Sequence, residues 1–228
     1  MLVVFDLDDT LIDTTGCLRN PAFKKVMTKL IEEGLVFEDE DKALAHLLEI
    51  DERCCSGKEA LEVFLGELVL ERALHEKYFN LGRDVYLTTA GTLPVAPLTG
   101  VISVLELLKR SHRLILVSCG DEQTQRLKLA RSAIAESLFS KIYILPTNYR
   151  KGTYALLLSE FEVRPEEVVV CGDRYEVDLK PAQELGMKTI LMRWGKGKMD
   201  TVGMKKADYT VSLLSEIPSI LQAMGERI

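Results

Sequence analysis

The sequence predicts an α/β fold, a doubly wound parallel sheet with an inserted all-helical domain. In the second half of the chain, short β-branched runs alternate with helical patterns, which is typical of a parallel sheet with right-handed crossovers. Between the first strand and this region, apolar residues repeat only at helical spacing. We therefore expect a sheet-containing core formed by residues 1–16 and 83–228, and a helical domain formed by residues 17–82.

The first strand is predicted at Leu2–Phe5, where a β-branched and aromatic run is too short for an independent helix. It leads directly into Asp6 and Asp8. In parallel sheets, ligands bind at the carboxyl edge, where this strand ends. Burying ionised carboxylates without a partner costs several kcal/mol or more. These two acids therefore need a cation, or a reaction that uses them.

The helical domain is predicted from capping residues and apolar stripes. Asn20 is expected to cap a helix, a second helix begins after Asp39, and Ser56 starts a third with the capping-box pattern Ser-Gly-Lys-Glu. The helical pattern continues toward Phe79, and residues 88–99, with their glycine and prolines, are expected to form a return linker.

The remaining elements alternate in order along the chain. Strands are predicted at 113–118, 141–145, 167–172, 188–192 and 208–212. Helices are predicted at 100–110, 122–131, 151–161, 179–186 and 214–225. Ser118 and Asp173 fall at strand ends, so we expect them at the same edge of the sheet as Asp6.

Bulk composition excludes several classes of protein. The net charge of −6 argues against nucleic-acid binding, which normally shows as a basic patch. No apolar run approaches the ~20 residues that span a bilayer, and the first residues lack the basic region of a signal peptide. Five cysteines form no C-x-x-C pair and three histidines show no ligand spacing, which disfavours zinc. We expect a cytoplasmic protein; its oligomeric state leaves no signal in the sequence.

Four motifs resemble, in order, those of the haloacid dehalogenase-like (HAD) phosphohydrolase superfamily, with a C1-type cap. The first is an apolar strand running into D-x-D-x-T, the second an apolar strand ending in Ser, the third a Lys opening a helix, and the fourth a strand running into G-D-x-x-x-x-D. In this chain they are Asp6–Thr10, Leu114–Ser118, Lys151-Gly152 and Gly172–Asp178. A single short acidic motif is a weak signal, whereas four in order are specific.

The resemblance implies a role for each acid. Asp6 would be the nucleophile that forms an aspartyl-phosphate, and Asp8 the general acid–base. Mg²⁺ is the implied cofactor, since it prefers oxygen ligands at sites that handle phosphate. Its ligands would be the side chains of Asp6 and Asp173 and the backbone carbonyl of Asp8. Asp178 would act from outside this ligand set, through water or by orienting a neighbour.

The resemblance also implies residues that hold the phosphate. The Ser118 hydroxyl and the backbone amides around Cys119 and Gly120 would contact the phosphoryl oxygens, as helix N-termini commonly do. A plain helix cap is the alternative for Ser118. Thr10 would hydrogen-bond near the nucleophile, or only stabilise its turn.

Lys151 is expected to supply the positive charge beside Asp6 and the phosphate. Lys141 and Arg150 are competitors. Lys141 precedes an apolar run and is expected to start a strand facing solvent, and Arg150 is expected to point elsewhere on the turn. Lys151 is preferred because Lys-Gly at a helix start is the pattern of the family that the chain resembles.

The function implied is that of a Mg²⁺-dependent phosphatase for a small phosphorylated metabolite, whose helical insertion closes over the site as a cap. A sugar phosphomutase keeps the same residues and stays open. Dehalogenases typically lack the second acid of the first motif and need no metal, so Asp8 and Asp173 disfavour that reaction. A phospho-accepting signalling module is disfavoured by the helical insertion.

The substrate stays open among phosphoglycolate, sugar phosphates and nucleoside monophosphates. Arg19, Arg53 and Lys58 lie near predicted helix ends of the insertion. They are candidates to meet an anionic substrate, with solvated charge as the better interpretation of each.

Overall fold

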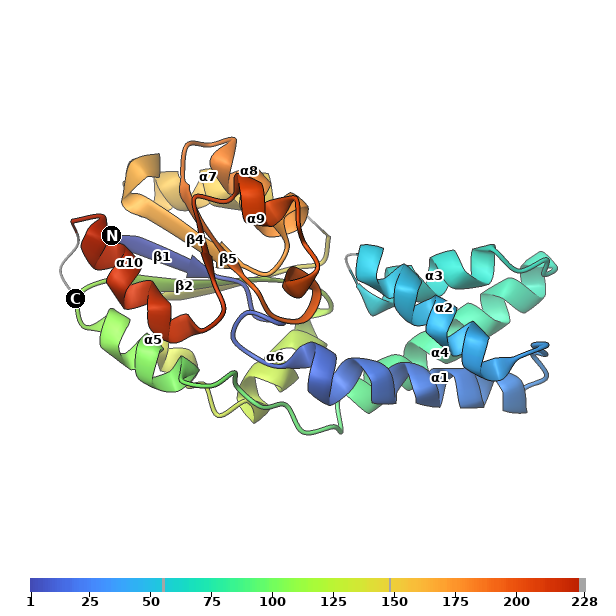
Figure 1. Ribbon diagram of the computed structural model, residues 1–228. Coiled ribbons are helices and arrows are strands. Elements are labelled where there is room, and N and C mark those ends of the chain that lie inside the picture. The colour runs from blue at the N-terminus through green and yellow to red at the C-terminus, as the bar shows by residue number, and fades with distance from the viewer. Residues whose placement is uncertain (55, 148, 226–228) are drawn as a thin grey trace. The chain divides into compact units, whose positions relative to one another are not determined.

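The computed structural model describes residues 1–54, 56–147 and 149–225 (Figure 1). It divides into two compact units. The sheet unit consists of Met1–Thr14 and the residues from Val95 onward, and the helical unit of Thr15–Pro94. The division differs from the predicted boundaries, because residue 82 lies inside a helix that continues to Ala90.

Among its described residues, the sheet unit contains six parallel strands in the order β3-β2-β1-β4-β5-β6, which confirms the predicted fold class. The strands are β1 Leu2–Phe5, β2 Arg113–Cys119, β3 Lys141–Leu145, β4 Val168–Gly172, β5 Lys188–Met192 and β6 Tyr209–Val211. From β1 the chain winds outward through β2 and β3, then returns to the other side of β1 at β4. The strand order therefore reverses at β1 and β4, the position where open parallel sheets bind ligands.

Helices cover both faces of the sheet (Figure 1). They are α5 Val101–Lys109, α6 Glu122–Arg131, α7 Arg150–Glu160, α8 Lys180–Gln183, α9 Gly203–Lys206 and α10 Ile217–Ala223. Alternate residues of β1 point to opposite faces, and Leu2 and Val4 pack in the core with Tyr154 and Leu157 of α7. Helices α5 and α6 lie on the opposite face. Both faces are thus buried, as the continuous apolar run of β1 predicts.

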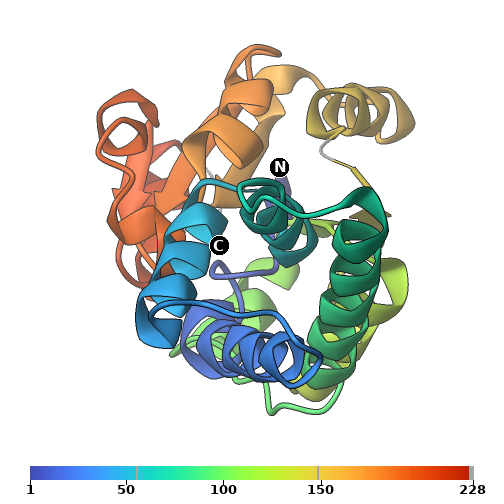
Figure 2. The same ribbon diagram turned by 90° about the vertical axis from the view of Figure 1, so that its right-hand side faces the viewer.

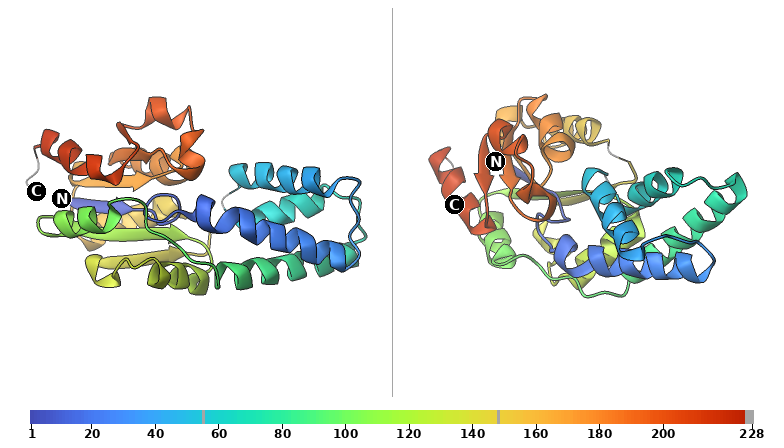
Figure 3. Two further views of the ribbon diagram at one scale, coloured as in Figure 1. Left: turned by 60° about the horizontal axis from the view of Figure 1, so that its bottom comes forward. Right: turned by 45° about the vertical axis from the view of Figure 1, so that its right-hand side comes forward.

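The helical unit has its own hydrophobic core, which in the described part of the chain is built from four helices (Figure 2). They are α1 Asn20–Glu32, α2 Glu40–Arg53, α3 Gly57–Gly66 and α4 Arg72–Ala90. α1 runs beside α4, and α2 packs on α3 (Figure 3). The predicted caps of α2 and α3 are confirmed, since the side chains of Asp39 and Ser56 accept hydrogen bonds from the amides of Lys42 and Glu59.

Two predictions about the helices of this unit, one cap and one linker, are wrong. Asn20 does not cap α1, because a π-helical turn, Thr15–Arg19, precedes it and the helical backbone has already begun. The segment from residue 88 is not yet a linker, because α4 continues through Ala90 and ends at Gly91. Arg19 is buried in an ion pair with Asp51, and this removes it from the candidates for substrate contact.

The two chain segments that connect the units are hydrogen-bonded to each other within the sheet unit. The amide of Asp13 donates to the carbonyl of Ala96 (2.9 Å) and the amide of Leu98 to that of Leu11 (2.9 Å). An antiparallel bridge pairs Ile12 with Pro97. The outgoing and returning chain thus form a short paired neck. No helix in the described part of the chain is long and apolar enough to cross a membrane.

Candidate active site

Asp6 lies at the reversal point of the sheet. Its amide donates to the carbonyl of Cys171 in β4 (2.9 Å), so the chain continues the β1–β4 pairing by one residue. The chain then turns sharply, and the amides of Leu11 and Ile12 both donate to the carbonyl of Leu7. Asp6 is only 6% exposed, so this turn holds a carboxylate in the interior at the carboxyl edge.

Arg150 is the cation beside Asp6. One nitrogen of its guanidinium contacts Oδ1 of Asp6 (2.5 Å) and Oδ1 of Asp178 (2.9 Å), while the other terminal nitrogen donates to the carbonyl of Val117 (2.8 Å). Burial lowers the pKa of Arg150, but the two carboxylates outweigh it and hold that pKa well above its ordinary value. The planar fork of the guanidinium suits this bridging geometry better than a lysine ammonium does.

The prediction that Lys151 supplies this charge is wrong. Its Nζ pairs with Glu184 at the surface (2.6 Å), and its side chain is 57% exposed. α7 begins at Arg150, and successive residues of a helix point about 100° apart. The first residue therefore faces the sheet edge and the second faces outward. Lys141 also pairs at the surface, with Glu160, as expected of a residue at the start of a strand.

Three buried carboxylates converge at this edge. One oxygen from each of Asp6, Asp173 and Asp178 lies within 4.8 Å of the other two. Gly172 permits this approach, because a Cβ at its position would lie 2.5 Å from Cβ of Asp178. Asp178 accepts from Arg150 through one oxygen and from the amide of Arg174 through the other (3.0 Å). Its predicted place outside the metal ligands stays a prediction.

The acids raise one another's pKa. Burial raises the pKa of Asp6 to about 7, Arg150 opposes this, and Asp178 and Asp8 add to it. Burial also raises the pKa of Asp173 well above its ordinary value, and the neighbouring carboxylates Asp178, Asp9 and Asp6 reinforce the shift. A divalent cation would relieve this repulsion, so the donor set, all carboxylate oxygen, fits a hard ion such as Mg²⁺.

Asp8 has partners that the sequence did not predict. Nζ of Lys128 contacts both of its oxygens (2.8 and 3.0 Å), and Nε2 of Gln125 donates to Oδ2 (2.7 Å). The hydroxyl of Thr14 donates to Oδ1 (2.5 Å). Burial raises the pKa of Asp8. Lys128 and the hydrogen bonds from Gln125 and Thr14 lower this pKa by more than burial raises it, so that the net shift is downward.

A signal for Lys128 and Gln125 was present in the sequence. They lie three residues apart in the predicted helix 122–131, and residues at that spacing share a face. Leu129 is buried on the same helix. A lysine and a glutamine on the inward side of this helix, which follows the second motif, indicate that the helix contributes polar side chains to the site.

The predicted phosphate-binding residues are only partly in place. Ser118 is buried at the end of β2, and its Oγ accepts from Nε2 of Gln125 (2.6 Å). The amide of Gly120 donates to the carbonyl of Leu145 (2.8 Å), and this removes it from the donors expected to hold phosphate. The Cys119 carbonyl accepts from Gln125 (3.1 Å). The Thr10 hydroxyl is buried and has no hydrogen-bond partner among the described residues, so no bond to the nucleophile is formed.

The turn after β1 is supported from the other end of the chain. Nε1 of Trp194 donates to Oδ1 of Asp13 (3.0 Å). Asp9 adopts a left-handed backbone conformation (φ 55°), and its carboxylate packs so closely on Gly195 that a Cβ there would lie 2.3 Å away. Asp9 and Asp13 thus stabilise the turn, and the contact with Asp9 requires glycine at position 195.

The chain matches the model of one protein family, described as haloacid dehalogenase-like hydrolase, over residues 1–186. A glyceraldehyde 3-phosphate phosphatase from Pyrococcus furiosus is 29% identical, with 98% of this chain and 92% of the relative covered. The human N-acylneuraminate-9-phosphatase is 24% identical, with 99% and 95% covered. The solved structure of a predicted phosphoglycolate phosphatase from Haemophilus somnus has a TM-score of 0.75 at 19% identity, with 97% of each chain covered, and shows the same fold.

The fold, the site and these comparisons first define a class: a hydrolase whose acids lie at the reversal point of a parallel sheet. More specifically, the chain belongs to the haloacid dehalogenase-like hydrolases. Its curated relatives are phosphatases by name, and the enzyme is a phosphatase.

Proposed function

We propose that the protein is a Mg²⁺-dependent hydrolase of small phosphomonoesters that works through an aspartyl-phosphate at Asp6. The observation that carries the proposal is the buried group formed by Asp6, Arg150 and the acids Asp173 and Asp178, with Asp8 two residues beyond the nucleophile. A carboxylate at this edge, held by an arginine and not by a solvated lysine, has a fixed direction for attack.

In the first step, an oxygen of the Asp6 carboxylate attacks phosphorus while the ester P–O bond breaks. The electron pair of that bond goes to the leaving oxygen, which takes a proton from the Asp8 carboxyl group. The products are an alcohol and a phosphorylated Asp6, so a single difficult displacement is divided into two easier ones. General acid catalysis of this kind typically contributes about 10²–10⁴-fold to the rate.

In the second step, water attacks phosphorus of the aspartyl-phosphate. Asp8, now a carboxylate, takes a proton from that water, and the Asp6 carboxylate leaves. Inorganic phosphate is released, and both acids return to their initial states. Asp8 thus serves as acid and then as base. The donors around it favour its carboxylate form, which is the form that the second step requires, so Asp8 must take up a proton before the first step.

The remaining residues stabilise charge. Arg150 would reduce repulsion between the Asp6 carboxylate and the incoming phosphate, and the Ser118 hydroxyl would contact a phosphoryl oxygen. Asp6 and Asp173, with the carbonyl of Asp8, would hold Mg²⁺, whose charge neutralises the phosphoryl oxygens when it is bound. Asp178 would hold Arg150 and the backbone at Arg174 in place.

The helical unit is proposed to be the cap that limits access of water and selects the substrate. Support comes from its position in the chain, between the first and second motifs, and from its separate hydrophobic core. The named substrates of the two relatives are phosphate esters of small molecules, and we propose a small phosphorylated metabolite for this protein as well.

The test is phosphate release from a panel of small phosphomonoesters, measured with Mg²⁺ and with EDTA. We expect metal-dependent release for the native protein. Asp6→Asn removes the nucleophilic oxygen while keeping the volume of the side chain, so it should lower turnover by at least about 10³-fold. Its circular dichroism spectrum should match that of the native protein. Retained activity in the folded variant would end this proposal, and isomerised product without phosphate release would indicate a phosphomutase.

A further inference from the structure

Asp8 is enclosed by one side of α6. Lys128 contacts both carboxylate oxygens, and Gln125, one turn earlier, donates to Oδ2. The Lys128 side chain is only 9% exposed. A lysine is almost never this deeply buried unless it is paired, and its one ion pair in the described part of the chain is with Asp8.

Stability alone does not account well for this lysine. Replacing a buried ion pair by apolar side chains of similar volume is often neutral or stabilising. A role limited to stability is therefore a weak explanation for a buried lysine whose carboxylate partner lies two residues after the proposed nucleophile. What the ion pair does provide is a fixed direction for both oxygens of Asp8.

Gln125 extends this support to the phosphate side of the site. Its Nε2 lies 2.6 Å from Oγ of Ser118 and 2.7 Å from Oδ2 of Asp8. Gly120 leaves room for it, since a Cβ there would lie 3.3 Å from the Gln125 side chain. One amide group thus sets the distance between the hydroxyl proposed to hold phosphate and the carboxylate proposed to move the proton.

We infer that Lys128, assisted by Gln125, is a positioning residue that aims the Asp8 carboxyl group at the leaving oxygen. This inference rests on the proposed function, in which Asp8 is the general acid. Lys128 would act through Asp8, its ion-pair partner in the described part of the chain. Proton transfer depends steeply on alignment, and a shift of about 1 Å in a reacting group is enough to cost about 10²-fold in rate.

The effect of losing Lys128 should depend on the leaving group of the substrate. An alkyl phosphate has a leaving oxygen of high basicity that must be protonated as the ester bond breaks. The leaving group of 4-nitrophenyl phosphate is a stable anion that needs no acid. The value of kcat/KM covers only the steps up to phosphorylation of Asp6, so it isolates the step in which Asp8 acts as an acid. Misalignment of the Asp8 carboxyl group should therefore lower kcat/KM for alkyl esters selectively.

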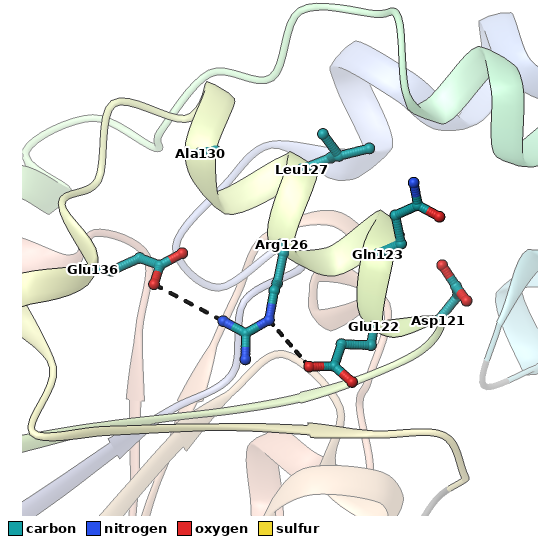
Figure 4. A pocket seen from close by; sticks show the side chains of 7 residues that line it. All are labelled: Asp121, Glu122, Gln123, Arg126, Leu127, Ala130 and Glu136. Carbon is teal, nitrogen blue, oxygen red and sulfur yellow. Dashed lines mark hydrogen bonds and ion pairs between the residues drawn. The ribbon is translucent and has the colours of Figure 1, made fainter.

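The experiment compares kcat/KM for the best alkyl phosphate of the panel and for 4-nitrophenyl phosphate. Lys128→Met should lower the alkyl value by about 10-fold to 100-fold and the aryl value by less than about 3-fold. Lys128→Arg, which restores a cationic donor, should recover part of the alkyl activity. Arg126→Met is the matched control, because Arg126 lies on the same helix but pairs outward with Glu122 and Glu136 (Figure 4).

Asp8→Asn distinguishes failure of the proposed function from failure of the role proposed for Lys128. If this variant loses alkyl and aryl activity equally, Asp8 is not the acid and the proposed function fails. If it is selective for alkyl esters but Lys128→Met lowers both equally or neither, the role of Lys128 is refuted while the proposed function stands. Should Lys128→Met fail to fold, Lys128→Gln and Gln125→Met supply the same comparison with smaller changes of polarity.

Discussion

At the scale of residues, the first turn of α7 separates two adjacent cations completely. Arg150 is 3% exposed and bridges Asp6 and Asp178, whereas Lys151 pairs with Glu184 at the surface. The ring of Tyr149 lies close to Gly152 in the same turn, and a Cβ on Gly152 would come within 2.1 Å of it. The glycine of the Lys-Gly motif therefore accommodates the tyrosine that precedes the buried arginine.

Arg150→Met and Lys151→Met form a matched pair that tests this assignment. Arg150→Met leaves two buried carboxylates without their cation, so we expect a loss of about 10²–10³-fold in kcat/KM. Lys151→Met removes only an exposed ion pair, worth about 0–1 kcal/mol, and should keep activity within about twofold. Phosphate release under identical metal concentrations measures both. The reverse ranking would restore Lys151 as the catalytic cation.

The carboxylates of the site could be predicted, because Asp6 and Asp173 follow apolar strands directly and strand ends share one edge. The cations could not be assigned in the same way. A long side chain reaches several ångströms, and a shift of one residue in a helix start turns it by about 100°. Arg150 and Lys128 depend on that phase, which no strand pattern determines.

At the scale of elements, one carboxylate links the edge of the sheet to the neighbouring strand, in addition to the backbone pairing of β5 with β6. β6 has only three residues, and Asp208 just before it accepts hydrogen bonds from the amide (2.9 Å) and the hydroxyl (2.8 Å) of Thr189 in β5. Lys188 adds a contact of 3.3 Å. Burial raises the pKa of Asp208, but the hydrogen bonds from Thr189 and the charge of Lys188 outweigh this and lower it.

Asp208→Asn should therefore destabilise the sheet unit in a pH-dependent way. A carboxyl group whose pKa is lowered by folding stabilises the fold above its unfolded pKa of about 3.9, and this contribution is lost as the pH falls through the folded value. We expect a deficit of about 1 kcal/mol at pH 7 that shrinks toward pH 3. Urea unfolding at several pH values measures it, and a deficit that grows on acidification would contradict the assignment.

Element types could be predicted better than element ends. All six strands were predicted within one or two residues of their observed ends, because each is a compact apolar run. The ends of helices depend on backbone geometry that a local pattern does not carry. The π-helical turn at Thr15–Arg19 moves the helical start ahead of Asn20, and α4 continues past the threonines at 88 and 89 until Gly91.

At the scale of the whole molecule, two hydrophobic cores share one chain. The acids and their arginine belong to the sheet unit, and Phe64 is buried in the core of the helical unit, beside Phe37. Ligands that bind only the folded state stabilise it, by about 2.7 kcal/mol at 100 times Kd. Metal should therefore act on one unit alone.

Calorimetry of the full chain with Mg²⁺ and with EDTA tests this independence. Mg²⁺ should raise the melting temperature of the sheet-unit transition, and Asp173→Asn should remove most of that increase. Phe64→Ala should cost about 3–5 kcal/mol in the helical unit and leave the metal response unchanged. A single transition that shifts with both changes would show that the two cores unfold together.

The paired neck at Ile12–Asp13 and Ala96–Leu98 has a consequence for the ancestry of such proteins. Its hydrogen bonds hold the two ends of the insertion together within the sheet unit. The entropic cost of closing the intervening loop then rises by only about 0.6 kcal/mol for each doubling of its length. A lineage can therefore exchange the inserted module for a longer, shorter or unrelated one at a single junction, without rebuilding the sheet.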